Sequence, residues 1–338
     1  MSDLELDDDA RDDVLQRSIL PHYFPDVAAT SDPPTLCLLA GPPGAGRSRA
    51  SSLLLAEHGP DLAIVNGDDL RGFHPRYADL VSTPTPEARE GLARATAGWV
   101  RGCIRYARGN RRSLALEGTF QDPSVAVGTA ERFRAEGFET RVVVVASRRA
   151  ESLLSVTSLY LRNVQAGVRP RFTSREVHDR GFEATRTLVG AVEDAASVDR
   201  LTVLGRDGST VFDARRADGA DAFRGAGGAL AATQSARMGR FDATQLLSEL
   251  HHVTEFAAAR RDLPRGVTES LVDLHELALR EVIPELHVPA EGKFATAIEQ
   301  KTVASLVALR RSVQPERPVD AAAPVLVPAG PERGGVSR

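Results

Sequence analysis

Eight consecutive residues have the types and spacing of a phosphate-binding loop: Gly41, Pro42, Pro43, Gly44, Ala45, Gly46, Arg47 and Ser48. They match the pattern G-x-x-x-x-G-K-[S/T] at every defined position except one. Glycines let the backbone curl until successive N–H groups point at phosphate oxygens, and a helix that begins at the end of the loop adds the positive end of its dipole. We therefore expect residues 41–48 to bind a nucleotide, ATP or GTP, with the Ser48 hydroxyl on Mg²⁺. The alternative is a Gly/Pro-rich turn without a ligand.

The exception is Arg47, where the pattern has Lys. Lys is a compact charge, whereas the guanidinium of Arg is longer, planar and forked, and it can hold two phosphate oxygens. The replacement keeps a charge for anion binding but is bulkier for following a γ-phosphoryl group during transfer. The sequence thus predicts phosphate binding by Arg47 and leaves catalysis open.

Polar residues that suit an acceptor site come next along the chain. Asp68 and Asp69 follow an apolar run at residues 62–66, and Glu117 and Thr119 end another. Ligands of open α/β sheets bind at the carboxyl ends of strands. A kinase needs a carboxylate there to take the proton of the acceptor hydroxyl. One aspartate can do this while the other caps a helix; Glu117 and Thr119 suit hydroxyl recognition or contact with Mg²⁺-bound water.

A basic group follows a predicted helix at residues 150–165 and comprises Arg162, Arg169, Arg171 and Arg175. Phosphoryl transfer spreads negative charge over the equatorial oxygens, and arginines of a mobile lid can neutralise it. A solvated basic face is the alternative interpretation of the same residues.

The elements that must carry these residues are those of an α/β fold. Apolar, β-branched runs at residues 35–40, 62–66, 113–117 and 141–146 read as strands buried on both faces. The segments between them are long enough for crossover helices. Two further runs, residues 201–204 and 210–212, flank a hairpin turn. We predict a P-loop kinase-like parallel sheet flanked by helices, with an additional C-terminal helical region.

Changes in composition predict the domain limits. We expect an acidic leader at residues 1–33, the P-loop domain at 34–216, a Gly/Ala-rich linker at 217–240, helices over 241–313 and a disordered tail at 314–338.

Composition also narrows the classes of partner. The net charge is -4, which argues against nucleic acid and anionic membranes as partners. The two cysteines, Cys37 and Cys103, lie in apolar stretches and read as buried thiols. The acidic N-terminal residues lack the basic-then-apolar pattern of a signal peptide, and no apolar run approaches the ~20 residues that span a bilayer. The expected compartment is the cytoplasm.

Taken together, the motifs resemble the zeta-toxin family of P-loop kinases. The resemblance covers about residues 34–215 and rests on GPPGAGRS (41–48), NGDDLRGFHP (66–75), LEGT (116–119), AEGFETRVVVVA (135–146) and RPRFTSREVHD (169–179). The first motif is generic, whereas the combination is specific. The family phosphorylates the 3′-hydroxyl of UDP-N-acetylglucosamine, and many members are toxins held in check by an antitoxin.

The resemblance implies roles for several residues. It assigns the catalytic base to Asp68, substrate contacts to Glu117 and Thr119, and a lid arginine to Arg171. The other lid arginine is expected near Leu159, and Arg162, one helical turn further on, is the candidate substitute.

The leading hypothesis is therefore an ATP- and Mg²⁺-dependent kinase of a sugar nucleotide, with an antitoxin as a protein partner. Two alternatives stay open. One is a nucleotide-binding module in which Arg47 keeps the phosphates bound without catalysis, and the other is a kinase of a different small-molecule hydroxyl.

Overall fold

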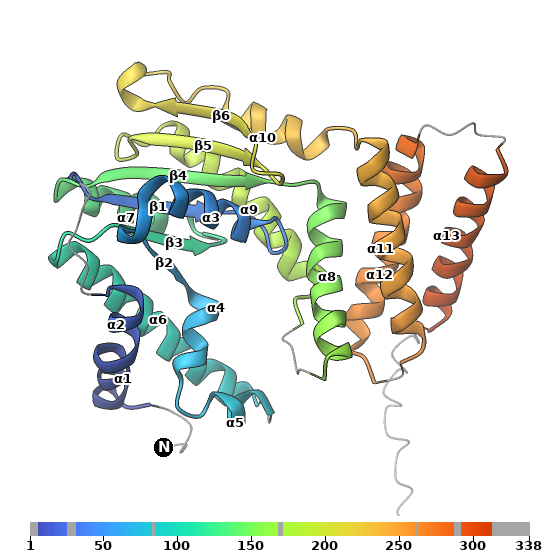
Figure 1. Ribbon diagram of the computed structural model, residues 1–338, viewed down its shortest axis with the longest axis horizontal. Coiled ribbons are helices and arrows are strands. Elements are labelled where there is room, and N and C mark those ends of the chain that lie inside the picture. The colour runs from blue at the N-terminus through green and yellow to red at the C-terminus, as the bar shows by residue number, and fades with distance from the viewer. Residues whose placement is uncertain are drawn as a thin grey trace, which may run out of the picture.

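The computed structural model describes residues 6–25, 32–82, 85–167, 172–260, 262–286 and 292–312. Its centre is a six-stranded sheet with the order β2-β3-β1-β4-β5-β6 (Figure 1). The strands are β1 (Thr35–Ala40), β2 (Ala63–Asn66), β3 (Leu114–Gly118), β4 (Glu139–Ala146), β5 (Arg200–Gly205) and β6 (Thr210–Arg215). The first five are parallel, and β6 pairs antiparallel with β5. The predicted α/β sheet and its closing hairpin are confirmed.

This strand order decides which loops meet. Parallel strands end at the same edge, and β1 lies between β3 and β4. The loops that begin at Gly41, Gly67, Thr119, Ser147 and Arg206 therefore share one edge of the sheet. All six residues of β1 are buried, as expected for a strand covered on both faces.

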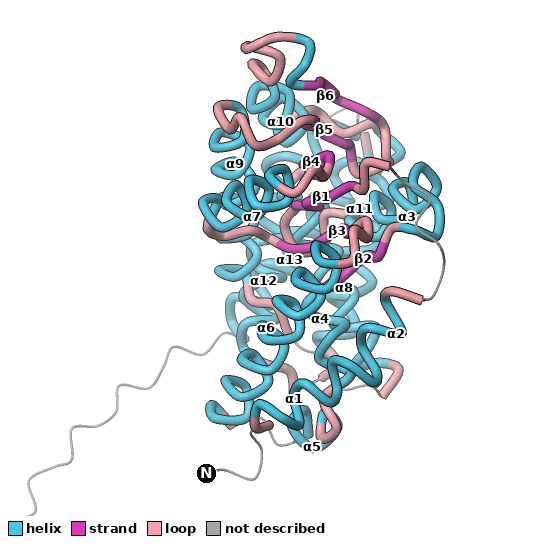
Figure 2. Tube along the Cα trace, turned by 90° about the vertical axis from the view of Figure 1, so that its left-hand side faces the viewer, coloured by secondary structure: helices cyan, strands magenta, loops and turns pink. Residues whose placement is uncertain are grey.

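Helices connect the strands and cover both faces. They are α3 (Arg47–His58), α4 (Gly67–Leu70), α5 (Tyr77–Ser82), α6 (Pro86–Gly109), α7 (Pro123–Ala135), α8 (Arg149–Gln165) and α9 (Arg175–Glu193), with short 3₁₀ turns at Gly59–Asp61, Arg71–Phe73 and Arg216–Asp218. Figure 2 shows α7 and α9 on one face of the sheet and α3 on the other. The larger core lies on the α7–α9 face, and α3 closes a smaller one.

The N-terminal segment corrects the predicted leader. Residues 8–23 form α1 (Asp8–Val14), a π-helical turn (Leu15–Ile19) and α2 (Leu20–Tyr23), which pack on α6. The Nε1–H of Trp99 donates to the carbonyl oxygen of Arg11 at 2.9 Å. A Cβ on Gly102 would lie only 2.3 Å from the Leu15 side chain. The acidic residues hid the fact that the apolar ones recur on one helical face and join the main core.

The predicted linker at residues 217–240 is corrected as well. It contains α10 (Ala226–Ser235), which packs on α9, β5 and β6. Phe223, Ala226 and Leu230 are buried in the main core. Small residues permit this close packing, and the Arg216 guanidinium lies 3.8 Å from the centre of the Phe223 ring. A Gly/Ala-rich composition here marks a tight interface.

The C-terminal helices lie where the sequence predicts them. They are α11 (Arg240–Ala258), α12 (Arg265–Leu277), which continues through a π turn (Ala278–Val282) and a 3₁₀ turn (Ile283–Leu286), and α13 (Lys293–Ser312). They stand beside the sheet next to α8 (Figure 1). Leu153 and Leu161 of α8 share a core with Leu250 of α11 and Leu271 of α12. The helix α8 thus belongs to the sheet domain and to the C-terminal bundle. The expected tail at 314–338 lies outside the described residues.

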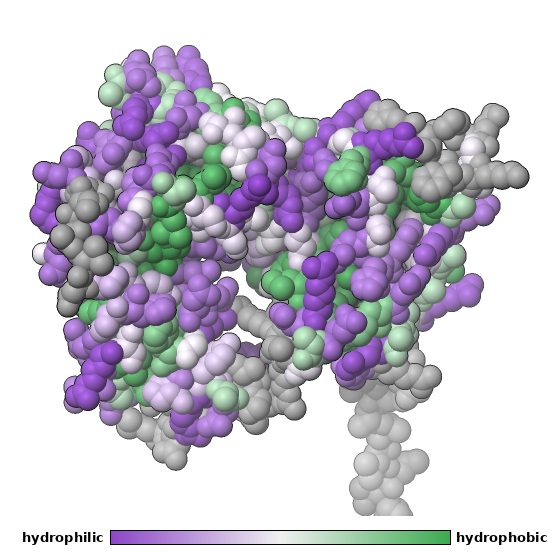
Figure 3. Space-filling model, in the orientation of Figure 1, coloured by the Kyte–Doolittle hydropathy of each residue, from purple (hydrophilic) through white to green (hydrophobic). Residues whose placement is uncertain are grey.

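The surface is mainly hydrophilic in the view of Figure 3, which also shows a hollow between the part that carries α4 and α5 and the part that carries α8. Over the described ranges, none of the helices combines the length and the apolar character needed to cross a bilayer.

Candidate nucleotide and acceptor site

The loop from Gly41 to Ser48 joins β1 to α3 and takes a shape that only glycine permits at two points. Gly44 and Gly46 have φ of 78° and 98°. A Cβ on Gly44 would lie 2.2 Å from the carbonyl oxygen of Ser152 in α8. Helix α3 begins directly after Gly46, with no side-chain cap and no acidic residue in its first turn. Its first N–H groups are thus oriented for an external anion.

Arg47 lies across the loop and points to the neighbouring strand β3. Its Nε–H donates to Oε1 of Glu117 at 2.9 Å, and its Nη1–H donates to the carbonyl oxygen of Gly41. Only 16% of its side chain is exposed. The sequence predicted a phosphate ligand at Arg47 and a substrate ligand at Glu117. The structure pairs these two residues with each other.

Glu117 of β3 accepts hydrogen bonds from residues of α3 and β2. Besides Arg47 of α3, its carboxylate accepts hydrogen bonds from the Ser51 hydroxyl and from the Asn66 side-chain amide at the end of β2, both at 3.3 Å. The Glu117 side chain is 12% exposed. A largely buried carboxylate with these partners fixes the ends of β2 and β3 against the phosphate loop.

The two candidate bases lie on α4, which starts at the end of β2. The helix is capped by Asn66, whose Oδ1 accepts from the N–H of Asp68 at 2.9 Å, so neither aspartate is needed as the cap. Asp68 is largely exposed and pairs with Arg71 at 3.0 Å. Burial raises the pKa of Asp69, and the negative charges of Glu117 and Asp68 add to this. Both carboxylates thus follow β2, at the edge of the sheet that also carries the phosphate loop.

Thr119 follows β3 and is half-buried where the phosphate loop meets α9. A Cβ on Gly181 of α9 would lie 2.8 Å from Cδ of Pro43 and 3.4 Å from Cγ2 of Thr119. The absent side chain at Gly181 therefore lets the prolines of the loop and Thr119 approach the same point of α9.

The basic group does not gather at the loop in the described residues. Arg162 is 62% exposed and donates to Glu249 of α11 at 2.6 Å. Leu159, at the position where the resemblance expects an arginine, is 61% exposed. Arg175 pairs with its neighbour Glu176. Arg169 and Arg171 lie outside the described residues. The structure thus leaves Arg162 away from the phosphate loop.

Sequence reasoning missed Arg206, which lies directly against the loop. Its Nη1–H donates to the carbonyl oxygen of Gly44, and its Nη2–H donates to Oγ of Ser155 in α8 at 2.6 Å. Arg206 falls in the predicted hairpin turn between residues 204 and 210, which indicated no functional role. The available signal was its place at the carboxyl end of a parallel strand close to β1, which is where ligand-binding residues are expected.

A chain of buried and partly buried polar groups behind the loop was missed as well. The Ser152 hydroxyl lies 2.9 Å from Nε2 of His178, whose Nδ1 lies 3.0 Å from Asp179. Arg149 at the start of α8 pairs with Asp179 and also with Asp273 of α12, at 2.8 and 2.6 Å. Burial lowers the pKa of His178, and Asp179 opposes this in part. The chain of contacts joins the loop, α8, α9 and α12.

The residues present fit an Mg²⁺ ion that arrives with a nucleotide. Across the described parts of the chain, no three His, Cys, Asp or Glu side chains are grouped so that they would hold a metal by themselves. Ser48 is exposed in the first turn of α3. Magnesium is commonly held by one or two protein oxygens together with substrate phosphates, and a serine at this position suits that role.

Comparisons with known proteins agree with this geometry. The sheet and the loop define a P-loop α/β fold. A model of the zeta toxin family matches residues 23–217, more than half of the chain, which therefore belongs to the zeta toxin family. The resemblance predicted from the motifs is confirmed.

Individual relatives are distant. Toxin PezT of Streptococcus pneumoniae is 26% identical over 190 residues, which are 55% of this chain and 74% of the toxin. Toxin zeta of Enterococcus hirae is 22% identical over 180 residues, 53% of this chain and 63% of that toxin. A solved structure from the PezAT chromosomal toxin-antitoxin system of Streptococcus pneumoniae has a TM-score of 0.65 at 20% identity and covers 75% of this chain and 99% of its own. It shows that the fold is shared.

Proposed function

We propose that this protein is a kinase that transfers the γ-phosphoryl group of ATP (or GTP) to a hydroxyl of a sugar nucleotide such as UDP-N-acetylglucosamine. The observation that carries the proposal is that the phosphate loop and the acceptor-side carboxylates share one edge of the sheet, with Arg47 and Glu117 in direct contact. Membership of the zeta toxin family supports it.

In the proposed reaction the N–H groups of the loop and Arg47 bind the donor phosphates. The acceptor hydroxyl oxygen forms a bond to the γ-phosphorus while the bond to the leaving diphosphate breaks, and the hydroxyl proton passes to the carboxylate of Asp68. Glu117 and Thr119 orient the acceptor. Bound Mg²⁺, held by Ser48, would supply charge neutralisation. Arg171 is the proposed lid arginine, and its role rests on the family motif.

One observation favours a second candidate, a nucleotide-binding module without transfer. The Arg47 guanidinium is engaged by Glu117 and by the carbonyl oxygen of Gly41. If these contacts persist with nucleotide bound, Arg47 holds the loop in shape and does not follow the γ-phosphoryl group.

The decisive measurement is ADP release from ATP by purified protein with a panel of UDP-sugars. We expect one acceptor to stimulate turnover, and Asp68→Ala to lower it by about 10²–10⁴-fold, the usual contribution of a general base, while ATP affinity stays nearly unchanged. Asp69→Ala is the matched control on the same helix. Full activity in Asp68→Ala with loss in Asp69→Ala would move the base to Asp69. Nucleotide binding without turnover for any acceptor would favour the module.

A toxin of this kind needs a restraining partner. A solved structure similar to this chain comes from a toxin-antitoxin system, and we propose that an antitoxin protein binds this chain in the cytoplasm. Expression of the chain alone in a bacterium should slow growth, and expression of Asp68→Ala should not. Equal growth of the two would count against toxicity by phosphoryl transfer.

A further inference from the structure

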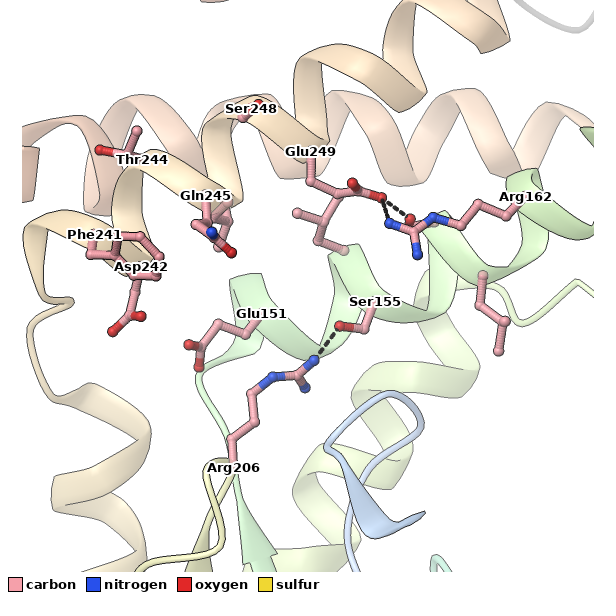
Figure 4. A pocket seen from close by; sticks show the side chains of 14 residues that line it. Glu151, Ser155, Arg162, Arg206, Phe241, Asp242, Thr244, Gln245, Ser248 and Glu249 are labelled. Atoms are coloured by element: carbon pink, nitrogen blue, oxygen red, sulfur yellow. Dashed lines mark hydrogen bonds and ion pairs between the residues drawn. The ribbon is translucent and has the colours of Figure 1, made fainter. Parts of the chain in front are cut away.

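A cleft of about 790 Å³ lies between α8 and α11 and has no role in the proposed reaction. Its volume is in the range of small-molecule sites. One wall is α8, the other is the first half of α11, and Arg206 stands at its base (Figure 4). Helix α11 lies beyond the segment that matches the family model, which ends at residue 217.

We propose that the nucleoside part of the donor nucleotide binds in this cleft, so that the C-terminal helix α11 supplies one wall of the nucleotide site. The inference rests on the proposed binding of nucleotide phosphates at the loop. It adds that residues outside the family segment determine how the base is held.

The first argument is continuity with the phosphate loop. Arg206 lines the cleft, and the same guanidinium donates to the carbonyl oxygen of Gly44 and to Ser155 of α8. The cleft therefore begins one side chain away from the phosphates. A nucleoside joined to those phosphates through its ribose reaches the cleft without leaving the edge of the sheet.

The second argument is the direction in which a nucleoside must extend from the phosphate loop. Of the proposed acceptor-side residues, Asp68 follows β2 and Glu117 lies near the end of β3, on one side of β1. The cleft is built by α8, which follows β4, and by Arg206, which follows β5, on the other side of β1. Donor and acceptor must meet at the γ-phosphorus from opposite sides, so the nucleoside extends away from the acceptor and toward the cleft.

The third argument is the chemistry of the lining. Phe241 and Leu159 are 72% and 61% exposed although they are large and apolar, and both line the cleft. A planar base can stack on such groups. Gln245 and Asp242 of α11 lie on the side that faces Arg206 in Figure 4 and offer an amide and a carboxylate to the edge of a base or to ribose hydroxyls.

The charges in the cleft favour an uncharged group over a phosphate. The three carboxylates of the lining, those of Glu151, Asp242 and Glu249, outnumber its two arginines, Arg162 and Arg206, and both arginines are already hydrogen-bonded to protein groups. At the far end, Glu249 accepts from both Arg162 and the Ser158 hydroxyl. That pairing engages the Arg162 guanidinium, the cation at this end of the cleft. The phosphates stay at the loop, and the nucleoside takes the cleft.

The test compares ligands that share the phosphates and differ in the nucleoside. Calorimetry gives the affinities of ATP, GTP and inorganic tripolyphosphate for the full chain, for Phe241→Ala and for Gln245→Ala. Both positions are exposed, so the fold should tolerate the changes. We expect Phe241→Ala to weaken ATP binding by about five- to a hundredfold, the usual effect of removing a stacking partner, with tripolyphosphate unaffected. Val303→Ala, on an exposed position of α13, is the control.

The outcomes separate this inference from the proposed function. Unchanged ATP affinity in both variants, or an equal loss for ATP and tripolyphosphate, overturns the nucleoside site and leaves phosphate binding at the loop intact. Wild-type protein that binds tripolyphosphate as tightly as ATP overturns it too. Wild-type protein that binds none of the three ligands refutes the proposed nucleotide function, and the nucleoside site with it.

Discussion

At the scale of single residues, the pairing of Arg47 with Glu117 changes what the replaced loop lysine means. A lysine at this position carries a single ammonium, whereas the guanidinium of Arg47 bonds a carboxylate and a carbonyl oxygen at the same time. Arg47 is therefore part of the framework that holds β3 against the loop. Whether it also binds the γ-phosphoryl group depends on how readily Glu117 releases it.

Gly44 is the residue of the loop with the least tolerance for change. Gly44→Ala puts a Cβ at a left-handed φ of 78° and 2.2 Å from the Ser152 carbonyl oxygen. We expect a loss of about 2 kcal/mol or more in unfolding free energy, since the left-handed conformation alone costs ~1–2 kcal/mol, together with loss of ATP binding. Urea unfolding and calorimetry measure the two effects.

The matched control is Gly190→Ala, in the last turn of α9 with no atom within 4 Å of the added Cβ. It should stabilise the protein by about 0.5–1 kcal/mol, because alanine favours a helix interior over glycine. A Gly44→Ala protein as stable as wild type would show that the loop can shift away from α8.

At the scale of elements, the buried contact between α8 and α9 should make stability depend on pH. His178 has a pKa below its ordinary value of 6.5, mainly because it is buried. As the pH falls, the imidazole of His178 is therefore protonated at a higher pH in the unfolded chain than in the folded chain. Its contribution to stability is present above pH 6.5 and is lost as the pH falls through the lowered value.

We expect the unfolding free energy of the wild type to fall between pH 7 and pH 5. In His178→Gln the slope should be smaller, and the difference between the two slopes can reach ~1.4 kcal/mol per pH unit, the effect of one proton. Denaturant unfolding at several pH values measures this. Carboxylates with lowered pKa values, such as Asp179, change the unfolding free energy only at pH values below this window. His252→Gln, at an exposed position, is the control, and identical slopes in wild type and His178→Gln would contradict the expectation.

The elements differ in how well their sequence predicts them. The strands β1 to β5 were predictable because each is a short, mainly apolar run, fully buried in β1, and the phosphate loop because its glycines are fixed by backbone geometry. The N-terminal helices and α10 were not. In those segments, acidic residues or a Gly/Ala-rich composition conceal a narrow apolar face that becomes visible only against its partner helix.

The residues of the candidate site were also only partly predictable from the sequence. Asp68, Glu117 and Thr119 follow predicted strands, so their common edge could be foreseen. The place of Arg206 at the end of β5 could be foreseen as well, but its partner could not. The contacts of Arg206 with Gly44 and of Arg149 with Asp273 join residues far apart in sequence. Pairings of this kind depend on how helices pack, which no local pattern records.

At the scale of the whole molecule, α8 makes the sheet domain and the C-terminal helices share buried residues. The chain has one tryptophan, Trp99, which is fully buried in α6 within the sheet domain. Leu271→Ala in α12 should lower the urea midpoint reported by Trp99 fluorescence, by an amount equivalent to about 2–5 kcal/mol, if the two parts unfold together.

Circular dichroism should follow the same curve as fluorescence, since one cooperative unit gives coincident transitions. Val303→Ala, exposed on α13, should leave the midpoint in place. An unmoved fluorescence midpoint in Leu271→Ala, with an earlier step in circular dichroism, would show that the C-terminal helices unfold independently.

The packing of the first helices on α6 also matters for producing the protein. The family match begins at residue 23, the last residue of α2. A shortened chain that starts there would lose Leu15, Ile19 and Leu20 from the core and would leave the indole N–H of Trp99 without its acceptor on Arg11. The surface of α6 that these helices cover would then be exposed. It is apolar and includes Gly98 and Gly102, and exposed apolar surfaces promote aggregation. Recombinant protein should therefore keep these helices, although they contribute no residue to the proposed chemistry.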